Sequence, residues 1–271
     1  MNKVKVVLLT GGSSGIGAAT AKLLAENGMK VYSGSRRGTA GDPADGVIPI
    51  RLDVNDALSV KDAVETVLKN EGHLDALVCN AGNGIYGPVE GTTEEEARFQ
   101  FETCYFGALK CIEACLPIFR KQGFGRIITV TSVMAILQLP FQGFYSSAKA
   151  AMLSLSESLS MELKGTGIQC CSVLPGDVKT GFTAARKFTA YSQEEDCPYK
   201  EEMKHNLAKI EKDETTGMEP LVIGKAILRQ LQRSKMKVRV IPRLDYKAVG
   251  FIVRILPEGW KLPILKKLYN G

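Results

Sequence analysis

Residues 143–152 read GFYSSAKAAM and place a tyrosine and a lysine four positions apart, at Tyr145 and Lys149. In a helix, side chains at i and i+4 share one face, so the phenol and the ammonium could reach the same pocket. A carbonyl that accepts a hydride needs a hydrogen-bond donor and a proton source. Tyr145 could give the proton, the charge of Lys149 would lower the tyrosine pKa, and Ser132 could donate a hydrogen bond. The alternative is an ordinary pair on a helix surface.

Segments with the apolar patterns of strands and helices alternate along the chain around this pair. Val4–Leu9 is a continuous apolar run before two glycines, as in a strand buried on both faces of a parallel sheet. The alternation predicts right-handed crossovers, and hence an α/β fold with a doubly wound parallel sheet of about seven strands and helices on both faces. The predicted strands are 4–9, 31–35, 47–52, 74–79, 126–131, 168–174 and 238–241. The predicted helices are 16–27, 56–69, one from Thr92 or Thr93 to 120, 144–164 and 219–233.

The sequence TGGSSGIG, residues 10–17, stands between the first predicted strand and the first predicted helix. Gly11, Gly15 and Gly17 would let the chain turn sharply, let its backbone approach a pyrophosphate and let the helix pack close to the sheet. The N-terminus of that helix would face the anion. A merely glycine-rich turn is the alternative, but this placement favours a Rossmann-type dinucleotide site.

The end of the second predicted strand bears on the choice of cofactor. A carboxylate there would accept the ribose hydroxyls of NAD, but residues 33–38 read SGSRRG and the first acid beyond is Asp42. Arg36 and Arg37 instead offer donors suited to the 2′-phosphate of NADP. We therefore expect NADP(H), against the alternative that two surface arginines solvate a loop.

Composition excludes several other classes. The 35 Lys and Arg exceed the 29 Asp and Glu by 6, but no basic run with interleaved aromatics predicts nucleic-acid binding. The seven cysteines lie mostly in apolar runs and the two histidines are isolated, so we expect buried reduced thiols and no metal site. No apolar run approaches a spanning helix or a signal peptide, and we expect a cytoplasmic protein.

We assign residues 1–271 to a single Rossmann domain that binds NAD(P), because no linker is visible. Residues 181–217 lack sheet periodicity and predict a mobile substrate lid with one or two short helices. Residues 243–271 predict a helical tail that mixes apolar and basic side chains.

Six motifs follow one another in the order found in a known family. They are TGGSSGIG at 10, LDV at 52, CNAG at 79, Ser132 after the fifth strand, YSSAK at 145 and PGDVKT at 175. Over about residues 4–181 the chain thus resembles the classical short-chain dehydrogenase/reductase family. Within that family, the chain is most similar to the branch with hydroxysteroid and retinol dehydrogenases, because of YGPVE after CNAG and because of the long tail.

The resemblance implies that Ser132, Tyr145 and Lys149 are catalytic. It also implies that Asp53 contacts the adenine and that Thr180 contacts the nicotinamide amide. We call residues 10–17 the phosphate turn. The cofactor residues expected from this turn, the two arginines and the resemblance are Gly11, Ser13, Ser14, Gly15, Ile16, Gly17, Arg36, Arg37, Asp53, Val54, Asn80, Ala81, Gly82, Tyr145, Lys149, Pro175, Gly176, Val178 and Thr180.

One position departs from the family pattern. An asparagine three residues before a glycine usually supports a water that relays protons toward the lysine, and alignment on Gly107 puts Cys104 there. A thiol is a weak hydrogen-bond partner, so we expect an altered relay. Either the substitution is tolerated with some loss of rate, or activity is strongly impaired.

The substrate end suggests an apolar pocket for a steroid-like, retinoid-like or fatty carbonyl or alcohol, with plain core packing as the alternative. The residues that suggest it are Phe182, Phe188, Tyr191, Met203 and Leu207, with Val133, Leu137, Leu139, Phe141 and Phe144.

The leading hypothesis is an NADP(H)-dependent oxidoreductase that interconverts a carbonyl and an alcohol. A cofactor-sensing protein without turnover is the alternative from another class, and an epimerase or enoyl reductase is disfavoured by the Tyr-Lys spacing. The tail could lie on a membrane, cover the pocket or contact another subunit. By resemblance we also expect a homodimer or homotetramer.

Overall fold

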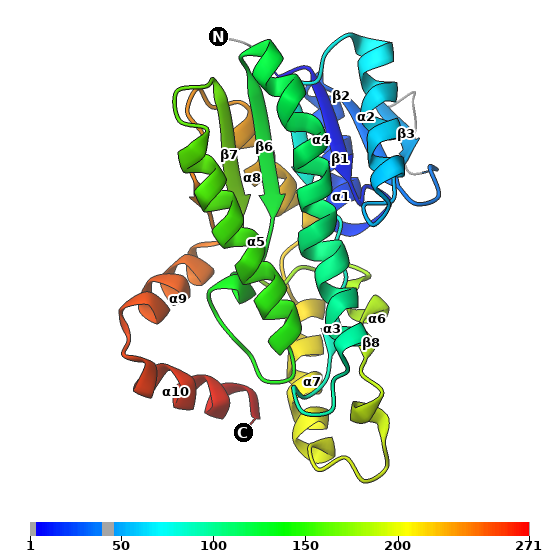
Figure 1. Ribbon diagram of the computed structural model, residues 1–271. Coiled ribbons are helices and arrows are strands. Elements are labelled where there is room, and N and C mark those ends of the chain that lie inside the picture. The colour runs from blue at the N-terminus through cyan, green and yellow to red at the C-terminus, as the bar shows by residue number, and fades with distance from the viewer. Residues whose placement is uncertain (1–3, 40–45, 271) are drawn as a thin grey trace.

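A central parallel sheet organises the chain. The computed structural model describes residues 4–39 and 46–270, so Asp42 lies outside the described residues. Seven strands form the sheet in the order β3-β2-β1-β4-β6-β7-β9, and every neighbouring pair is parallel (Figure 1). These strands are β1 (Val6–Thr10), β2 (Lys30–Ser35), β3 (Val47–Arg51), β4 (Ala76–Cys79), β6 (Gly125–Val130), β7 (Ile168–Val173) and β9 (Arg239–Val240). The predicted doubly wound fold is confirmed, with strand ends shifted by one or two residues.

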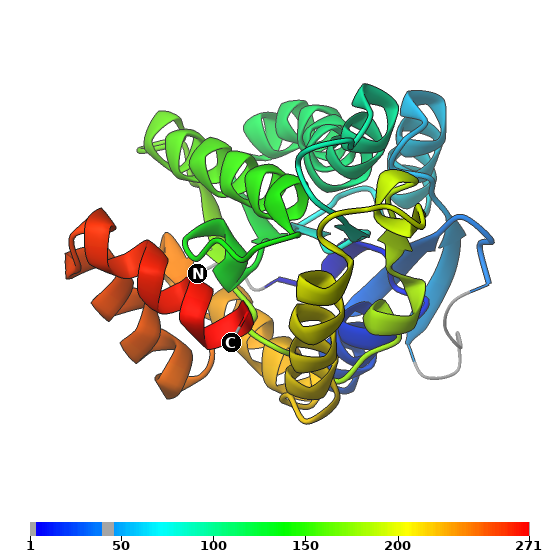
Figure 2. The same cartoon turned by 90° about the horizontal axis from the view of Figure 1, so that it is seen from below.

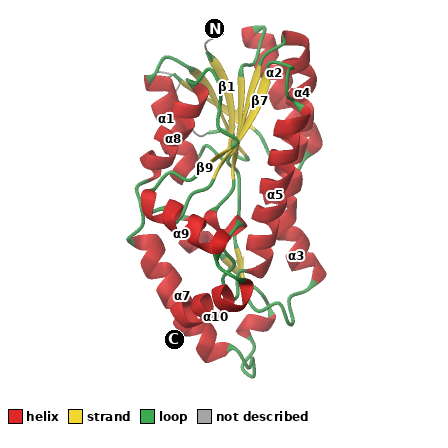
Figure 3. Cartoon of the chain, turned by 90° about the vertical axis from the view of Figure 1, so that its left-hand side faces the viewer, coloured by secondary structure: helices red, strands yellow, loops and turns green. Residues whose placement is uncertain are grey.

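Helices cover both faces of the sheet, as Figure 3 shows edge-on. The helices α1 (Gly15–Glu26) and α8 (Pro220–Leu231) pack together on one face. The other face carries α2 (Ala57–Glu71), α4 (Gly107–Gln122) and α5 (Gly143–Glu162). Each face has its own apolar core, so every sheet strand except the short edge strand β9 and the outer strand β3 is almost entirely buried.

Local signals in the sequence explain several helix ends. Asp56 caps α2 by accepting a hydrogen bond from the Leu58 N–H, at 2.9 Å. Thr93 and Glu96 form a reciprocal capping box at the start of α3 (Glu94–Phe101). The predicted single helix to residue 120 is wrong in one respect, because a π-helix turn (Glu102–Phe106) joins α3 to α4. That turn contains Cys104, and π-turns recur at functional sites.

The segment 181–217 has more regular structure than its pattern predicted. It contains α6 (Phe182–Ala185), the strand β8 (Lys187–Phe188), a 3-10 turn (Tyr191–Gln193) and α7 (Lys200–Thr215). The expectation of short helices only is wrong for the sixteen-residue α7. The strand β8 pairs with β5 (Ile85–Tyr86), a long-range contact that periodicity does not reveal.

Polar contacts tie α7 to the rest of the molecule. The buried Tyr86 hydroxyl donates to α7 through the Met203 carbonyl and the Asn206 side chain, at 2.9 and 3.0 Å. Burial raises the pKa of Tyr86, which therefore stays a hydrogen-bond donor. These contacts hold α7 beneath the carboxyl ends of the sheet strands (Figure 1).

The tail consists of α9 (Leu244–Ile255) and α10 (Glu258–Asn270). Figure 2 shows the two helices at the edge of the molecule, with the end of α10 beside α7. Within the described ranges, no helix is long and apolar enough to cross a membrane.

The cysteines and the metal-binding residue types add no covalent or metal cross-link to the described part of the chain. All seven cysteines are free and buried, as expected. Burial raises the pKa of the Cys111 and Cys170 thiols to about 12, so both stay protonated at neutral pH. Among the described residues, no group of His, Cys, Asp and Glu side chains could hold a metal ion.

Candidate active site

The order of strands reverses between β1 and β4, and the loops that follow these two strands are joined by hydrogen bonds. The Thr10 hydroxyl accepts from the backbone N–H groups of Asn80 and Ala81, both at 3.0 Å. The Asn80 amide donates to the carbonyls of Thr10 and Gly11, also at 3.0 Å. In parallel α/β sheets, ligands bind in the crevice at such a reversal. Residues of the TGGSSGIG and CNAG motifs are therefore fixed to each other at the expected place.

The glycines of the phosphate turn satisfy two geometric demands. Gly11 has a φ of +68°, which favours glycine. A Cβ atom on Gly17 would lie 2.1 Å from the Gly11 carbonyl oxygen and 2.6 Å from the Asn80 amide nitrogen. The first turn of α1 has no acidic residue, so its N-terminus keeps its partial positive charge. This cradle fits the pyrophosphate of a dinucleotide.

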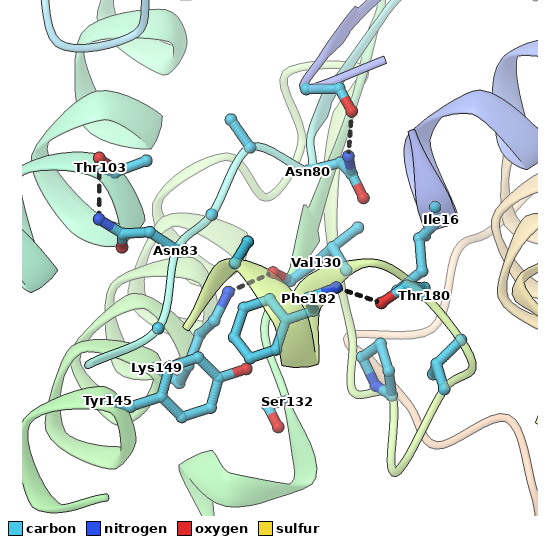
Figure 4. A pocket seen from close by; sticks show the side chains of 18 of the residues that line it. Ile16, Asn80, Asn83, Thr103, Val130, Ser132, Tyr145, Lys149, Thr180 and Phe182 are labelled. Atoms are coloured by element: carbon cyan, nitrogen blue, oxygen red, sulfur yellow. Dashed lines mark hydrogen bonds between the residues drawn. The ribbon is translucent and has the colours of Figure 1, made fainter. Parts of the chain in front are cut away.

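The helix α5 carries Tyr145 and Lys149 on one face. The Tyr145 hydroxyl points toward Ser132, just after β6, and the Lys149 ammonium points toward the Val130 carbonyl (Figure 4). Lys149 is 6% exposed and donates to the Val130 carbonyl at 3.2 Å. The Lys149 ammonium lies 5.7 Å from the centre of the Tyr145 ring. The Tyr145 ring also lies beside the Phe182 ring, with the ring centroids 5.7 Å apart. A surface pair is excluded, because Lys149 is buried.

Burial dominates the ionisation of Tyr145. It raises the pKa of the phenol, while the charge of Lys149 and the hydroxyl of Ser132 oppose the rise. The charge of Lys149 lowers the pKa of Tyr145 as expected, but desolvation outweighs the ammonium among the chain's own groups. Tyr145 keeps its proton at neutral pH, which is the state that a proton donor needs.

One continuous pocket of about 580 Å³ joins the phosphate turn to these three side chains. Every expected site residue lines it except Arg37, which is exposed at the end of β2 and lies outside the lining. The expected residues in the lining are Gly11, Ser13, Ser14, Gly15, Ile16, Gly17, Arg36, Asp53, Val54, Asn80, Ala81, Gly82, Ser132, Tyr145, Lys149, Pro175, Gly176, Val178 and Thr180.

Amide groups surround the unusual Cys104. The buried Gln100 side chain donates to the thiol sulfur at 3.1 Å and to the Asn83 carbonyl at 3.1 Å. The Gln100 side-chain oxygen, Oε1, accepts from the Ile85 N–H at 2.8 Å. Asn83 in turn donates to Thr103 at 3.4 Å (Figure 4). The thiol thus sits in a polar network that holds the segment 83–85, of which Asn83 and Gly84 line the pocket.

Several pocket residues were missed because they come from distant segments. Tyr246 of α9 and Tyr269 of α10 line the pocket, as do Asp213 and Glu214 of α7. The Tyr246 hydroxyl donates to the Asp177 carboxylate and accepts from the Asp177 N–H at 3.2 Å. The motif PGDVKT was the one available signal, since Asp177 belongs to it.

The expected apolar lining is confirmed only in part. Val133, Leu137, Leu139 and Phe182 line the pocket. Four others instead form a separate small core around Tyr86, because α7 packs there. These are Phe141, Tyr191, Met203 and Leu207.

A parallel sheet with a phosphate turn at its strand reversal defines a dinucleotide-binding α/β protein, and the buried Tyr-Lys pair beside that turn points to hydride-transfer chemistry. A family model for short chain dehydrogenases matches residues 5–190. The chain therefore belongs to the short-chain dehydrogenase family of oxidoreductases, which act on alcohol and carbonyl groups with nicotinamide cofactors.

Individual relatives span most of the chain. A 3-ketodihydrosphingosine reductase from Bacteroides thetaiotaomicron is 37% identical over 93% of this chain and 90% of its own length. Human 17-beta-hydroxysteroid dehydrogenase type 1 is 35% identical over 65% of this chain and 58% of its own length. The solved structure of a short-chain dehydrogenase from Streptomyces avermitilis superposes with a TM-score of 0.83 at 30% identity, covering 99% of this chain and 98% of that one. Structures of similar fold occur in complex with NAD and with NADP, so the fold does not select the cofactor.

We predict that Gly17→Ala weakens dinucleotide binding by about tenfold or more, because the new methyl group would displace the Gly11 carbonyl or the Asn80 amide. Titration of protein fluorescence with NADPH measures this. Gly259→Ala is the control, since nothing lies within 4 Å of its added methyl group. Equal affinities of the two variants would contradict the role of Gly17.

Proposed function

We propose that this protein is an NADP(H)-dependent oxidoreductase that interconverts a ketone and an alcohol on a lipophilic substrate. The observation that carries the proposal is the convergence of Ser132, Tyr145 and Lys149 on the pocket that begins at the phosphate turn. The cofactor would supply or accept the hydride. Asn80, Gly82 and Thr180 line the stretch between the phosphate turn and the reacting groups, and would hold the cofactor there.

Each catalytic side chain then has a separate task. The protonated Tyr145 gives its proton to the carbonyl oxygen as charge develops there, and Ser132 donates a hydrogen bond to the same oxygen. The buried ammonium of Lys149 stabilises the resulting phenolate. In the oxidation direction the phenolate takes the proton back, so higher pH favours oxidation.

The preference for NADP(H) is supported by residues that line the part of the pocket where the adenosine of the cofactor would bind. Arg36, just beyond β2, and Asp53 both line the pocket. A guanidinium at Arg36 can bind a 2′-phosphate through two parallel hydrogen bonds. Arg37 would contribute only to the surrounding positive field.

A long-chain amino ketone is the substrate class that we favour. One relative that covers 93% of the chain is a 3-ketodihydrosphingosine reductase, and its substrate belongs to a compound class that joins an amino group to a long alkyl chain. The pocket has apolar side chains for such an alkyl chain and three carboxylates, Asp177, Asp213 and Glu214, in its lining. Burial raises the pKa of Asp177, and the charges of the other two carboxylates add to the rise. An ammonium group bound near them would relieve this repulsion.

We further propose a cytoplasmic homo-oligomer. The free, buried thiols of all seven cysteines suit a reducing compartment. The resemblance to the family supports an assembly through α4 and α5.

Removal of the guanidinium at Arg36 should change cofactor choice. We expect Arg36→Ala to weaken NADPH binding by about tenfold or more, as for the loss of a charged hydrogen bond, while leaving NADH binding nearly unchanged. Arg37→Ala is the matched control and should have the smaller effect, because Arg37 does not line the pocket. Competition titrations with both cofactors test this, and equal affinities of the parent protein for NADH and NADPH would refute the preference.

Removal of the phenolic hydroxyl should abolish turnover without loss of the cofactor. We expect Tyr145→Phe to lower kcat for carbonyl reduction by about 10² to 10⁴ and to leave NADPH affinity nearly unchanged. In the parent protein, reduction should stay level through neutral pH and fall as the pH rises toward the raised pKa of Tyr145. NADPH oxidation at several pH values measures both effects. NADPH binding without turnover of any carbonyl in the parent protein would instead support a cofactor sensor.

The amino group of the substrate should matter. We expect 3-ketodihydrosphingosine to be reduced with kcat/KM about tenfold or more above that of its N-acetyl derivative, because acetylation removes one charged contact. A steroid ketone and a short aliphatic ketone complete the panel. Equal rates for the charged and acetylated compounds would rule out a role for the carboxylates, and selective reduction of the steroid would replace the proposed substrate class.

A further inference from the structure

The helices α9 and α10 concentrate the exposed apolar side chains of the molecule. Thirteen large hydrophobic side chains are exposed in the described part of the chain, and six of them lie between residues 244 and 264. Trp260, the single tryptophan of the sequence, is 68% exposed. The six are Leu244, Phe251, Ile252, Trp260, Leu262 and Ile264. A concentration of this kind marks an interaction surface.

The helix α9 has distinct inner and outer faces. Tyr246 and Gly250 lie four residues apart on the inner face. The Tyr246 ring packs over Gly176, and a Cβ atom on Gly250 would lie 3.2 Å from Ile136. Leu244 and Phe251, seven residues apart, lie on the outer face and are 78% and 66% exposed. The inner face already has its partner, and the outer apolar face points away from the protein.

The helix α10 repeats this arrangement. Leu265 is 8% exposed, and Tyr269 packs against α7, where the Asn206 amide donates to the Tyr269 carbonyl at 3.4 Å. Burial raises the pKa of Tyr269 to about 12. Trp260 and Ile264, four residues apart, lie on the outer side and are exposed, together with Lys267. We call the outer sides of α9 and α10, with the six exposed side chains above, the tail surface.

The charge of the tail favours one of the two partners that could cover the tail surface. Residues 243–271 contain six Lys and Arg and two Asp and Glu, so this segment carries 6 − 2 = +4 of the net +6 of the chain. Lys247, Lys266 and Lys267 are exposed. A second copy of the chain seated symmetrically on this surface would oppose two segments of charge +4, which is repulsive. An anionic lipid surface attracts the same charges.

We propose that the tail surface docks the protein onto the face of an anionic lipid bilayer. Amphipathic helices with basic residues and exposed Trp, Phe and Leu lie in the plane of the membrane interface, where indole rings are enriched. Docking would bury the outer side chains among lipid headgroups and leave Tyr246, Leu265 and Tyr269 in their contacts with the protein.

Docking would also bring the substrate pocket to the lipid. Tyr246 and Tyr269 line the pocket from the same two helices whose outer sides form the tail surface. A long-chain substrate could then pass from the bilayer to Tyr145 without crossing water. This delivery rests on the proposed function, whereas the docking does not.

Trp260 reports the docking directly. We expect its emission to shift to shorter wavelength when the full chain meets vesicles of phosphatidylcholine with phosphatidylglycerol, and much less with phosphatidylcholine alone. Phe251→Glu keeps Trp260 as the reporter and should weaken vesicle binding by about tenfold or more, the loss expected for one buried aromatic side chain. Added salt should weaken binding as well.

Matched controls make the test decisive. Leu58→Glu changes a side chain on α2 of similar exposure, 70% against 66% for Phe251, and this variant should bind vesicles like the parent. NADPH binding should be the same in both variants and the parent. The proposal is overturned if anionic vesicles leave the Trp260 emission unchanged, if Leu58→Glu and Phe251→Glu lose equal affinity, or if the emission shifts with protein concentration in the absence of lipid, which would indicate self-association. No enzyme turnover enters this measurement, so a wrong substrate class leaves the result intact.

Discussion

The hydrogen-bonded joint between the ends of β1 and β4 is the constraint on which the site depends. Parallel strands on either side of the reversal connect in opposite directions, so their loops part and leave a crevice. Thr10 and Asn80 close the base of that crevice through four hydrogen bonds, using both the side chain and the backbone of Asn80. Since no room remains for a methyl group on Gly17, helix α1 approaches close enough for its N-terminus to face the crevice.

The reacting groups are fixed by burial more than by direct pairing. Lys149 is buried on α5, and its ammonium donates a hydrogen bond to the Val130 carbonyl. Its charge therefore stays near Tyr145, where few water molecules can reach it. The same poor solvation keeps the phenol protonated. A thiol makes only weak hydrogen bonds. Around Cys104, the side-chain amide of Gln100 donates to both the thiol sulfur and the Asn83 side-chain oxygen, and the thiol donates to the same oxygen. Cys104 is the buried residue of the π-helix turn.

The sheet and its motifs could be predicted because their signals are local. Apolar runs identify strands that are buried on both faces, and the glycines of residues 11–17 and the Tyr145 to Lys149 spacing have meaning within one turn of chain. Contacts between distant segments leave no such pattern. The pairing of β5 with β8, the position of Tyr246 against Asp177 and the packing of Met203 around Tyr86 all depend on how 181–217 and 244–270 fold back on the sheet. Arg36 and Arg37 likewise look equivalent in the sequence, but Arg36 lines the pocket and Arg37 does not.

Two hydrogen bonds between Tyr246 and Asp177 connect the proposed membrane-docking tail to the lining of the pocket. Asp177 belongs to the loop whose neighbours Pro175, Gly176, Val178 and Thr180 line the cofactor end of the pocket, and Tyr246 belongs to the proposed membrane-docking tail. Thermodynamic linkage then requires reciprocity: by whatever factor lipid contact alters cofactor affinity, cofactor binding alters lipid affinity by the same factor. The concentration of cofactor in the cell would thereby help to set the fraction of the protein that rests on a membrane.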